Sequence, residues 1–230
     1  MRIDEVIQPI EEGPNDPHIF KAVFMAGGPG SGKSYVARKM LGGTGLRTIN
    51  SDEIYEYLMY KQNMDMSDPE IIASPKGQET RARAKELTQK RRRSYLDGRL
   101  GVIIDGTGKD VAKVAKDSEA LKSLGYDTMM IMVNTSLEQA QRLNKQRARR
   151  IPDEMVIKMW HAVQQNLMQF QQVFGAANFH VVDNTLGQEN KDREENFRQV
   201  YRNVQKFLNS PPSSREAKQW LKDQQPGSNE

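Results

Sequence analysis

A glycine-rich stretch near the start of the chain carries the residue types that bind phosphate. Residues 27–34 read Gly-Gly-Pro-Gly-Ser-Gly-Lys-Ser, which fits the P-loop pattern of Gly, four residues, Gly, Lys, and Ser or Thr. Glycines let successive backbone N–H groups point at one anion, and a following helix adds its unpaired N-terminal donors. Lys33 can reach the β- and γ-phosphates of a nucleoside triphosphate, and the Ser34 hydroxyl can bind Mg²⁺. The residues expected to contact the nucleotide are Gly27, Gly28, Pro29, Gly30, Ser31, Gly32, Lys33, Ser34 and Tyr35.

Three carboxylates follow apolar runs of the chain: Asp52, Asp105 and Asp183. If those runs are parallel strands, ligands collect beyond their carboxyl ends. Asp52 is the candidate for the base that takes the proton of an acceptor hydroxyl, and its alternative role is a helix N-cap. Asp105 is expected to bind Mg²⁺ through water or to position the acceptor, with a purely structural role as the alternative. Asp183 is predicted to be a turn residue.

Further polar side chains complete the predicted site. Thr107 lies in the tetrapeptide Asp-Gly-Thr-Gly that begins at Asp105, where its hydroxyl could donate to a phosphate or a sugar. Arg142 and Arg147 precede Pro152, and mobile arginines can neutralise the charge on a phosphoryl group in transfer. A solvated, basic helix end explains the two arginines equally well.

The elements that must position these residues alternate between strands and helices. Strands are predicted at about 20–26, 47–50, 101–105, 128–133 and 179–183 from their apolar runs. Helices are predicted after the P-loop, from an N-cap at Ser51 and Asp52, and over 79–96, 111–124, 152–174 and 194–208, with another beginning near Ser136. This alternation predicts an α/β fold with a parallel sheet of about five strands flanked by helices. Together with the P-loop, the candidate base and the arginines before Pro152, it indicates a P-loop NTPase fold of the kinase type with an arginine-bearing lid. Residues 63–77 contain two prolines and are predicted to be a mobile insertion over the acceptor side.

Length and composition set the limits of this prediction. The 230 residues suit one α/β domain, which we place at 20–208, with an N-terminal arm at 1–19 and a polar C-terminal tail at 209–230 that contains a short helix. The absence of cysteine excludes disulfides and thiolate metal sites, and no apolar run approaches the ~18 residues of a membrane span. We therefore expect no membrane partner and a cytoplasmic location. The net charge of +4 and the basic clusters at 90–93 and 142–150 permit a polyanionic partner, although such clusters are often solvated helix faces.

Four segments together resemble the zeta-toxin and polynucleotide-kinase group of P-loop kinases. They are the P-loop, Asn50-Ser51-Asp52-Glu53, residues 102–108, and the stretch from Arg142 through Arg147 to Pro152. The resemblance covers about residues 20–185 and implies that Asp52 acts as the base. Residues 142–159 look more like polynucleotide 5′-hydroxyl kinases, whereas residues 100–133 are closer to zeta toxins, which phosphorylate a UDP-linked amino sugar. Polynucleotide kinases carry an arginine for the acceptor phosphate at the place of Tyr55, and zeta toxins often have Glu at the place of Asp105.

The sequence therefore predicts an ATP-dependent, Mg²⁺-requiring kinase with a hydroxyl acceptor, bound near Asp52, Tyr55, Asp105 and Thr107. A nucleic-acid or nucleotide hydroxyl is preferred because of the basic clusters, while Tyr55 counts against it. One alternative is a nucleotide-sugar kinase of the zeta-toxin type. Another is a non-catalytic ATP-binding module that docks to a protein partner through 1–19 or 209–230.

Overall fold

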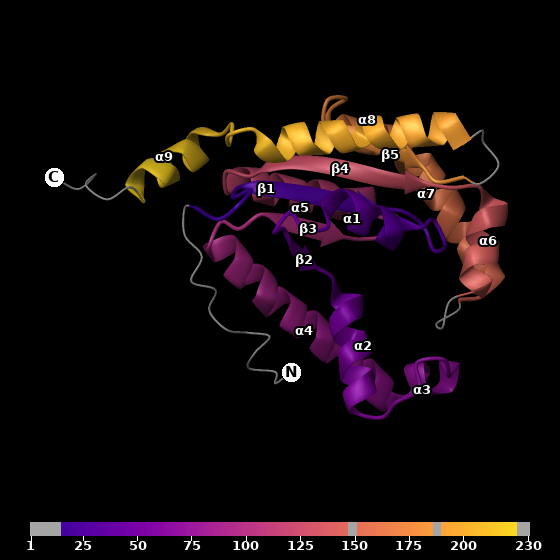
Figure 1. Ribbon diagram of the computed structural model, residues 1–230. Helices are drawn as coiled ribbons and strands as arrows, with labels where there is room; N and C mark the ends of the chain where they lie inside the picture. Colours follow the sequence, from indigo (N-terminus) through magenta and orange to yellow (C-terminus); the bar gives the residue numbers. More distant parts are fainter. Residues whose placement is uncertain (1–14, 147–150, 186–189, 225–230) are drawn as a thin grey trace.

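A five-stranded, all-parallel sheet forms the centre of the computed structural model, which describes residues 15–146, 151–185 and 190–224 (Figure 1). The strands are β1 (Lys21–Ala26), β2 (Arg47–Ile49), β3 (Val102–Asp105), β4 (Asp127–Asn134) and β5 (Phe179–Asp183). Their order is β2-β3-β1-β4-β5, so β1 with its following P-loop lies in the middle. Every residue of β1 is buried, as expected for a parallel strand covered on both faces. The predicted five-stranded parallel sheet is thus confirmed.

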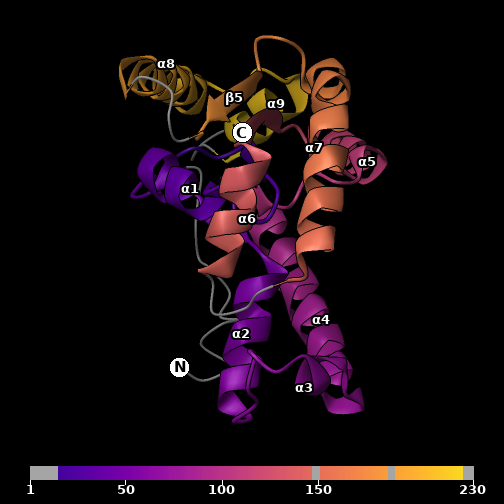
Figure 2. The same ribbon diagram turned by 90° about the vertical axis from the view of Figure 1, so that its right-hand side faces the viewer.

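Helices cover both faces of the sheet. One face packs against α1 (Lys33–Leu41) and α8 (Asn190–Asn209), and the other against α5 (Val111–Ser123), α7 (Asp153–Phe174) and α9 (Arg215–Asp223). Figure 2 shows the sheet between these two layers. Alternate residues of β1 supply the two cores, because successive strand side chains point to opposite faces. Phe24 therefore packs with Phe170 and Phe174, whereas Met25 packs with Val36 and Met40.

A helical projection extends from the β2–β3 side of the sheet. It consists of α2 (Ser51–Lys61), α3 (Pro69–Ala73) and α4 (Pro75–Asp97). Figures 1 and 2 show α2, α3 and the first part of α4 extending away from the two main layers, while the end of α4 packs against the main core through Tyr95 and Leu96. Its own apolar core joins Ile54, Tyr55, Leu58 and Met59 of α2 to Ala84 and Leu87 of α4. The packing of α2 on α4 holds the first turn of α2, which begins two residues after the end of β2.

The prediction that residues 63–77 form a mobile insertion is wrong, because they contain α3 and the start of α4. Pro69 and Pro75 each occupy the first turn of a helix, where proline is favoured because its missing N–H has no partner to lose. Asp68 and Ser74 cap these helices by accepting hydrogen bonds from the backbone N–H groups of Glu70 and Gly77. The prolines therefore mark helix starts here, not an irregular loop.

The C-terminal segment packs on the edge of the sheet opposite the P-loop. Ser210 and Asp127 both bind the ammonium of Lys21, which is 1% exposed, and Ser213 donates to Asp127. Trp220 of α9 lies edge-on to Phe20, with ring centroids 5.4 Å apart. Among the described residues, no helix has the length and apolar character that crossing a membrane requires.

Candidate active site

The P-loop forms one wall of a cleft of about 370 Å³ at the carboxyl end of the sheet. Residues 27–34, Asp52, Thr107 and Leu143 line it. The first turn of α1 begins at Lys33, and its N-cap residue Gly32 makes no side-chain capping bond. The first backbone N–H groups of a helix have no intrahelical partners, so the cleft faces donors suited to an anion. Ser31 is 3% exposed and its hydroxyl has no hydrogen-bond partner among the described residues.

Two glycines of the loop are required by close packing. Gly30 has φ +75°, and a Cβ atom there would lie 2.2 Å from the backbone oxygen of Ala140 in α6 (Leu137–Lys145). Gly32 has φ +83°, and a Cβ atom there would lie 2.1 Å from the side-chain nitrogen of Asn184. Left-handed backbone conformations favour glycine, and any larger residue would also push α6 or Asn184 away. The loop conformation is therefore fixed by its surroundings.

Asn184, which follows β5, links the P-loop to two helices, α8 and α6. Its side-chain amide donates to the Ser31 carbonyl at 2.8 Å and accepts from Arg193 of α8 at 2.9 Å. Its backbone carbonyl accepts from Gln139 of α6 at 2.7 Å. Asn184 is 8% exposed, so these bonds are shielded from water. Sequence reasoning missed this residue, and only its place after the last strand could have suggested it.

A continuous network joins the P-loop lysine to the start of α2. The Lys33 ammonium forms an ion pair with the Asp105 carboxylate at the end of β3. The other oxygen of Asp105 accepts a hydrogen bond from the Asn50 side chain at 2.7 Å. Asn50 in turn accepts from the backbone N–H of Asp52 at 2.8 Å. Lys33 and Asp105 are each less than one-fifth exposed. Because each bond of the network shares a residue with the next, a movement of Lys33 affects Asn50 and the start of α2.

Asn50 is the N-cap of α2, and the predicted cap at Ser51 and Asp52 is wrong. The Asn50 side chain accepts the capping bond, which is typical of asparagine at this position. This leaves the Asp52 carboxylate available for other contacts, and it lines the P-loop cleft. Asp52 Oδ1 lies 2.6 Å from Arg81 Nη1 of α4, in an ion pair in which Asp52 is 57% exposed.

Tyr55 is 1% exposed and lies in the core of the projection. The Arg81 guanidinium stacks on its ring, with Cζ 4.4 Å from the ring centroid. An arginine therefore does lie beside Asp52, but α4 supplies it from 29 residues away in the chain. No local sequence pattern could have revealed Arg81.

Two other predicted residues occupy different places. Thr107 lines the cleft, and its carbonyl accepts a hydrogen bond from Gly27 N at 3.3 Å, which ties the loop after β3 to the P-loop. Tyr35 is 44% exposed and lies beside Lys39, Arg193 and Phe197, in a hollow next to the P-loop cleft. Its contact with the nucleotide stays a prediction.

Glu53 is a site residue that the sequence reasoning passed over. Partial burial of its carboxylate and the nearby Asp105 charge raise the pKa of Glu53, while Arg91 and Lys33 act in the opposite direction. Arg91 is half-buried, and its Nε has no hydrogen-bond partner among the described residues. Three carboxylates, Asp52, Glu53 and Asp105, thus lie near three cations, Lys33, Arg81 and Arg91.

The candidate lid arginines are only partly described. Arg142 is exposed in the last turn of α6, one residue before Leu143 of the cleft wall. Arg147 lies outside the described residues. Asn144 fixes the flanks of that segment, because its side chain donates to the Ile151 carbonyl at 2.8 Å and accepts from the Ile151 N–H.

Asp183 is the last residue of strand β5 and not, as predicted, a turn residue. Its carboxylate accepts a hydrogen bond from the backbone N–H of Thr185 at 2.9 Å.

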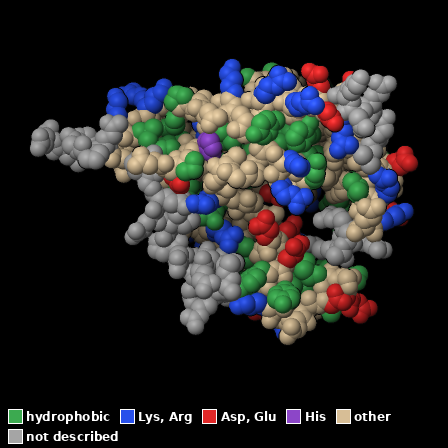
Figure 3. Space-filling model, viewed as in Figure 1, with side chains coloured by type: hydrophobic (Ala, Val, Ile, Leu, Met, Phe, Trp, Pro, Cys, Tyr) green, Lys and Arg blue, Asp and Glu red, His purple; other side chains and the backbone are tan. Residues whose placement is uncertain are grey.

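The basic cluster at 90–93 does not form one patch. Lys90 pairs with Glu86 on α4, Arg92 pairs with Asp117 of α5 at 3.1 Å, and Arg91 faces Glu53. Figure 3 shows basic and acidic side chains interspersed over one face of the molecule. A strip of uncompensated cations, which a phosphate backbone requires, is therefore not built from this cluster.

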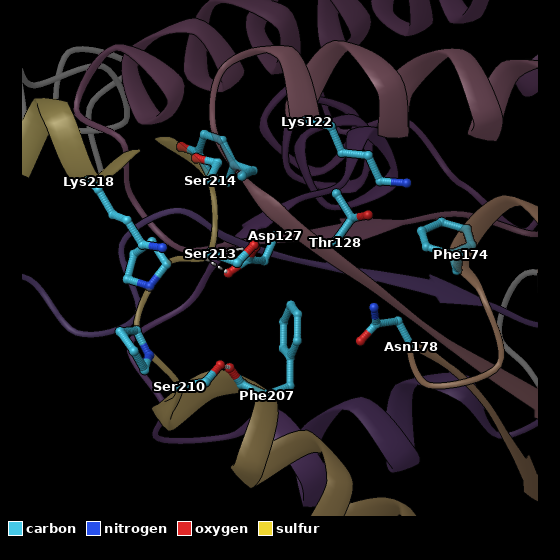
Figure 4. A pocket seen from close by; sticks show the side chains of 13 residues that line it. Lys122, Asp127, Thr128, Phe174, Asn178, Phe207, Ser210, Ser213, Ser214 and Lys218 are labelled. Carbon is cyan, nitrogen blue, oxygen red and sulfur yellow. Dashed lines mark hydrogen bonds between the residues drawn. The ribbon is translucent and has the colours of Figure 1, made fainter. Parts of the chain in front are cut away.

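A larger cavity of about 680 Å³ lies at the opposite edge of the sheet (Figure 4). Phe207, Asn178 and Lys122 lie around it, and Asp127 is hydrogen-bonded to Ser213 in its wall. None of the predicted site residues lines this cavity. The larger cavity is therefore not the candidate active site, because the P-loop residues, Asp52 and Thr107 line the smaller cleft.

The residues present fit Mg²⁺, which this class of fold implies. Ser34 and Asp105 offer oxygen ligands, the type that Mg²⁺ prefers. Among the described residues, no group of three His, Cys, Asp or Glu side chains could hold a metal ion. Mg²⁺ does not need such a group, because it usually keeps several water ligands and binds partly through substrate phosphates.

The central P-loop strand, the parallel strand order and the site at the carboxyl edge define a P-loop kinase fold. A family model described as "AAA domain" matches residues 23–176. Because this span is more than half of the chain, the chain belongs to the AAA domain family. No curated protein matches the chain significantly.

Solved structures of low identity share the fold. A structure of the PezAT toxin–antitoxin system of Streptococcus pneumoniae has 15% identity and a TM-score of 0.55, covering 89% of this chain and 92% of that one. A putative kinase of Chloroflexus aurantiacus has 13% identity and a TM-score of 0.55, covering 85% and 100%. The AvrRxo1-ORF1:-ORF2 complex with ATP has 13% identity and a TM-score of 0.55, covering 79% and 57%. The predicted resemblance to the zeta-toxin and polynucleotide-kinase group is thus confirmed at the level of the fold.

Proposed function

We propose that the protein is a kinase that transfers the γ-phosphoryl group of ATP to a hydroxyl group of an acceptor. The observation that carries this proposal is the convergence of the P-loop, Asp52 and Thr107 on one cleft, with Asp105 bound to Lys33. A phosphate-binding loop and a carboxylate on the acceptor side are the parts that phosphoryl transfer needs.

The residues then have distinct tasks. The P-loop N–H groups and Lys33 bind the β- and γ-phosphates, with Lys33 exchanging Asp105 for phosphate oxygens. Mg²⁺, held by Ser34 and Asp105, would neutralise charge on the phosphates. The acceptor oxygen attacks the γ-phosphorus, its proton passes to Asp52, and ADP leaves. Arg142 and Arg147 would neutralise the transferred group.

A small hydroxyl compound, such as a nucleotide sugar, is the acceptor class that we favour over a polynucleotide. The pairing of Lys90 with Glu86 and of Arg92 with Asp117 weakens the support that the basic cluster at 90–93 gives to a nucleic-acid acceptor. Near the P-loop lysine, the cations Lys33, Arg81 and Arg91 also lie close to the carboxylates Asp105, Asp52 and Glu53. A hydroxyl group of a single nucleotide is still a candidate acceptor, because one or two cations are enough to bind the phosphate of a mononucleotide.

A protein partner is a separate part of the proposal. The candidate docking segments are 1–19 and 209–230. Docking through 209–230 would use the outward face of α9, since its inner face contacts Phe20. A non-catalytic ATP-binding module in an assembly is the outcome expected if ATP binds and no acceptor is phosphorylated.

A phosphate-transfer screen tests the function. Radiolabelled ATP with Mg²⁺ would be incubated with the protein and with UDP-N-acetylglucosamine, free nucleosides or a 5′-hydroxyl oligonucleotide. We expect label on a small acceptor, with Lys33→Ala inactive and Lys39→Ala, at the exposed end of α1, active. Label on the oligonucleotide alone would overturn the small-acceptor class, and binding of ATP without any transfer would overturn the kinase.

A further inference from the structure

The two side chains of the Arg81–Asp52 ion pair are unequally exposed. Asp52 is 57% exposed, and exposed pairs contribute little to stability because both side chains lose freedom and water screens them. Arg81 is only 28% exposed, whereas Arg83 in the Arg83–Glu86 pair of the same helix is 48% exposed at the same distance of 2.6 Å. The Arg81 guanidinium is therefore covered by a further contact besides Asp52.

Tyr55 provides that support. Its ring is 1% exposed and packed within the apolar core of α2 and α4, so its orientation is fixed. The guanidinium lies 4.4 Å from the ring centroid, where a planar cation is attracted by the face of an aromatic ring. The Arg81 guanidinium therefore stacks with one face on the Tyr55 ring and binds Asp52 through Nη1.

The acidic partner is held from the other side. Asn50 accepts the Asp52 N–H and binds Asp105, so the backbone of Asp52 is fixed relative to the P-loop lysine. Arg81 adds the missing constraint on the side chain. We propose that Arg81 is a positioning residue that orients the Asp52 carboxylate for proton transfer, with Tyr55 as its platform; this inference rests on the proposed function.

The chemistry explains why an arginine is tolerated beside a base. In a loose phosphoryl-transfer transition state the acceptor oxygen bears little new bonding, so orientation matters more than base strength. Arginine itself cannot take the proton, because it stays protonated in proteins. Arg81 therefore acts only through Asp52.

That dependence can be measured with a double-mutant cycle on phosphate transfer. Arg81→Ala should lower kcat by about 10- to 100-fold, in line with the loss expected from a misplaced group, and leave the KM for ATP unchanged. In an Asp52→Asn background, Arg81→Ala should have no further effect. Arg81→Lys should recover only part of the rate, and added guanidinium should partly restore Arg81→Ala. Arg83→Ala, which removes an exposed arginine paired with Glu86 on the same helix, is the matched control.

The reaction measured is transfer to the acceptor found in the screen and, in parallel, hydrolysis of Mg-ATP. If the Arg81 and Asp52 effects add fully, or if Arg81→Ala raises the KM for the acceptor in both backgrounds, Arg81 does not act through Asp52 and the inference fails. A lowered melting temperature with kcat unchanged would show a structural role only and would also overturn it. If the wild-type protein turns over ATP with none of the acceptors and not with water, the proposed function fails and this inference falls with it.

Discussion

At the scale of single residues, charged side chains near the P-loop lysine are in contact with polar or oppositely charged neighbours. Lys33 binds Asp105, Asp105 binds Asn50, and Arg81 binds Asp52, so the proposed binding of ATP phosphates by Lys33 would change the contacts of Asp105. Glu53, which follows Asp52, has a raised pKa because partial desolvation and the Asp105 charge both disfavour its ionised form.

The raised pKa of Glu53 gives a prediction about stability. The folded state binds the Glu53 proton more tightly than the unfolded chain does, so the ionised carboxylate opposes folding at neutral pH. Glu53→Gln should therefore raise the free energy of unfolding at neutral pH, and the gain should disappear as the pH falls toward the ordinary value of 4.5. Urea denaturation across this range measures it, with Glu119→Gln on the exposed face of α5 as the control. A gain that is independent of pH would contradict the account.

At the scale of elements, the junction between β2 and α2 couples stability to chemistry. Asn50 caps α2 with its side-chain oxygen and reaches Asp105 with its side-chain nitrogen. One residue thus begins the helix that carries Asp52 and orients the carboxylate that binds Lys33. These two tasks can be separated by substitution.

Asn50→Ser and Asn50→Ala separate the cap from the bridge. Serine can cap a helix but cannot donate to Asp105 across this distance, so Asn50→Ser should keep its stability and lose about 10-fold in phosphate transfer. Alanine loses both contacts, and Asn50→Ala should in addition lose about 1 kcal/mol of stability. Thermal unfolding and transfer rates measured together check this. If Asn50→Ser transfers phosphate at the wild-type rate, the bridge to Asp105 has no part in the reaction.

The elements that could be predicted from sequence are those with local signals. Buried parallel strands read as apolar runs, and the P-loop has its own pattern, so the sheet and the nucleotide side of the cleft were both predictable. The α3 helix and the start of α4 are not predictable in the same way, because a proline is compatible both with an irregular loop and with the first turn of a helix, where Pro69 and Pro75 lie. Arg81 and Asn184 were missed for another reason. They reach the site from 29 and 153 residues away, through packing that no short stretch of sequence encodes.

At the scale of the whole molecule, the two edges of the sheet serve different purposes. The carboxyl edge bears the P-loop cleft with Asp52 and Thr107, whereas at the amino edge Lys21 of β1 binds Asp127 of β4 and Ser210. The same cluster holds the start of the C-terminal segment through Ser213. Stability and nucleotide binding should therefore respond to different substitutions.

Asp127→Ala tests this separation. It leaves the Lys21 ammonium, 1% exposed, without its carboxylate, and breaking a buried pair typically costs about 3–5 kcal/mol. We expect a loss of that size in urea denaturation, with the affinity for a fluorescent ATP analogue unchanged under conditions where the protein stays folded. Asp223→Ala, near the end of α9, is the control. A loss below about 1 kcal/mol would show that water reaches Lys21, and weakened ATP binding would show that the two edges are coupled.

The central claim is that Asp52 serves the chemistry of phosphate transfer and not the fold. The most direct measurement compares Asp52→Asn with the wild type for transfer from radiolabelled Mg-ATP, ATP affinity and melting temperature. Because Asn50 supplies the helix cap, we expect ATP affinity and melting temperature to be retained while transfer falls by about 10²–10⁴-fold, the usual contribution of a general base. Transfer at the wild-type rate, or a loss of stability with unchanged kinetics, would contradict the claim.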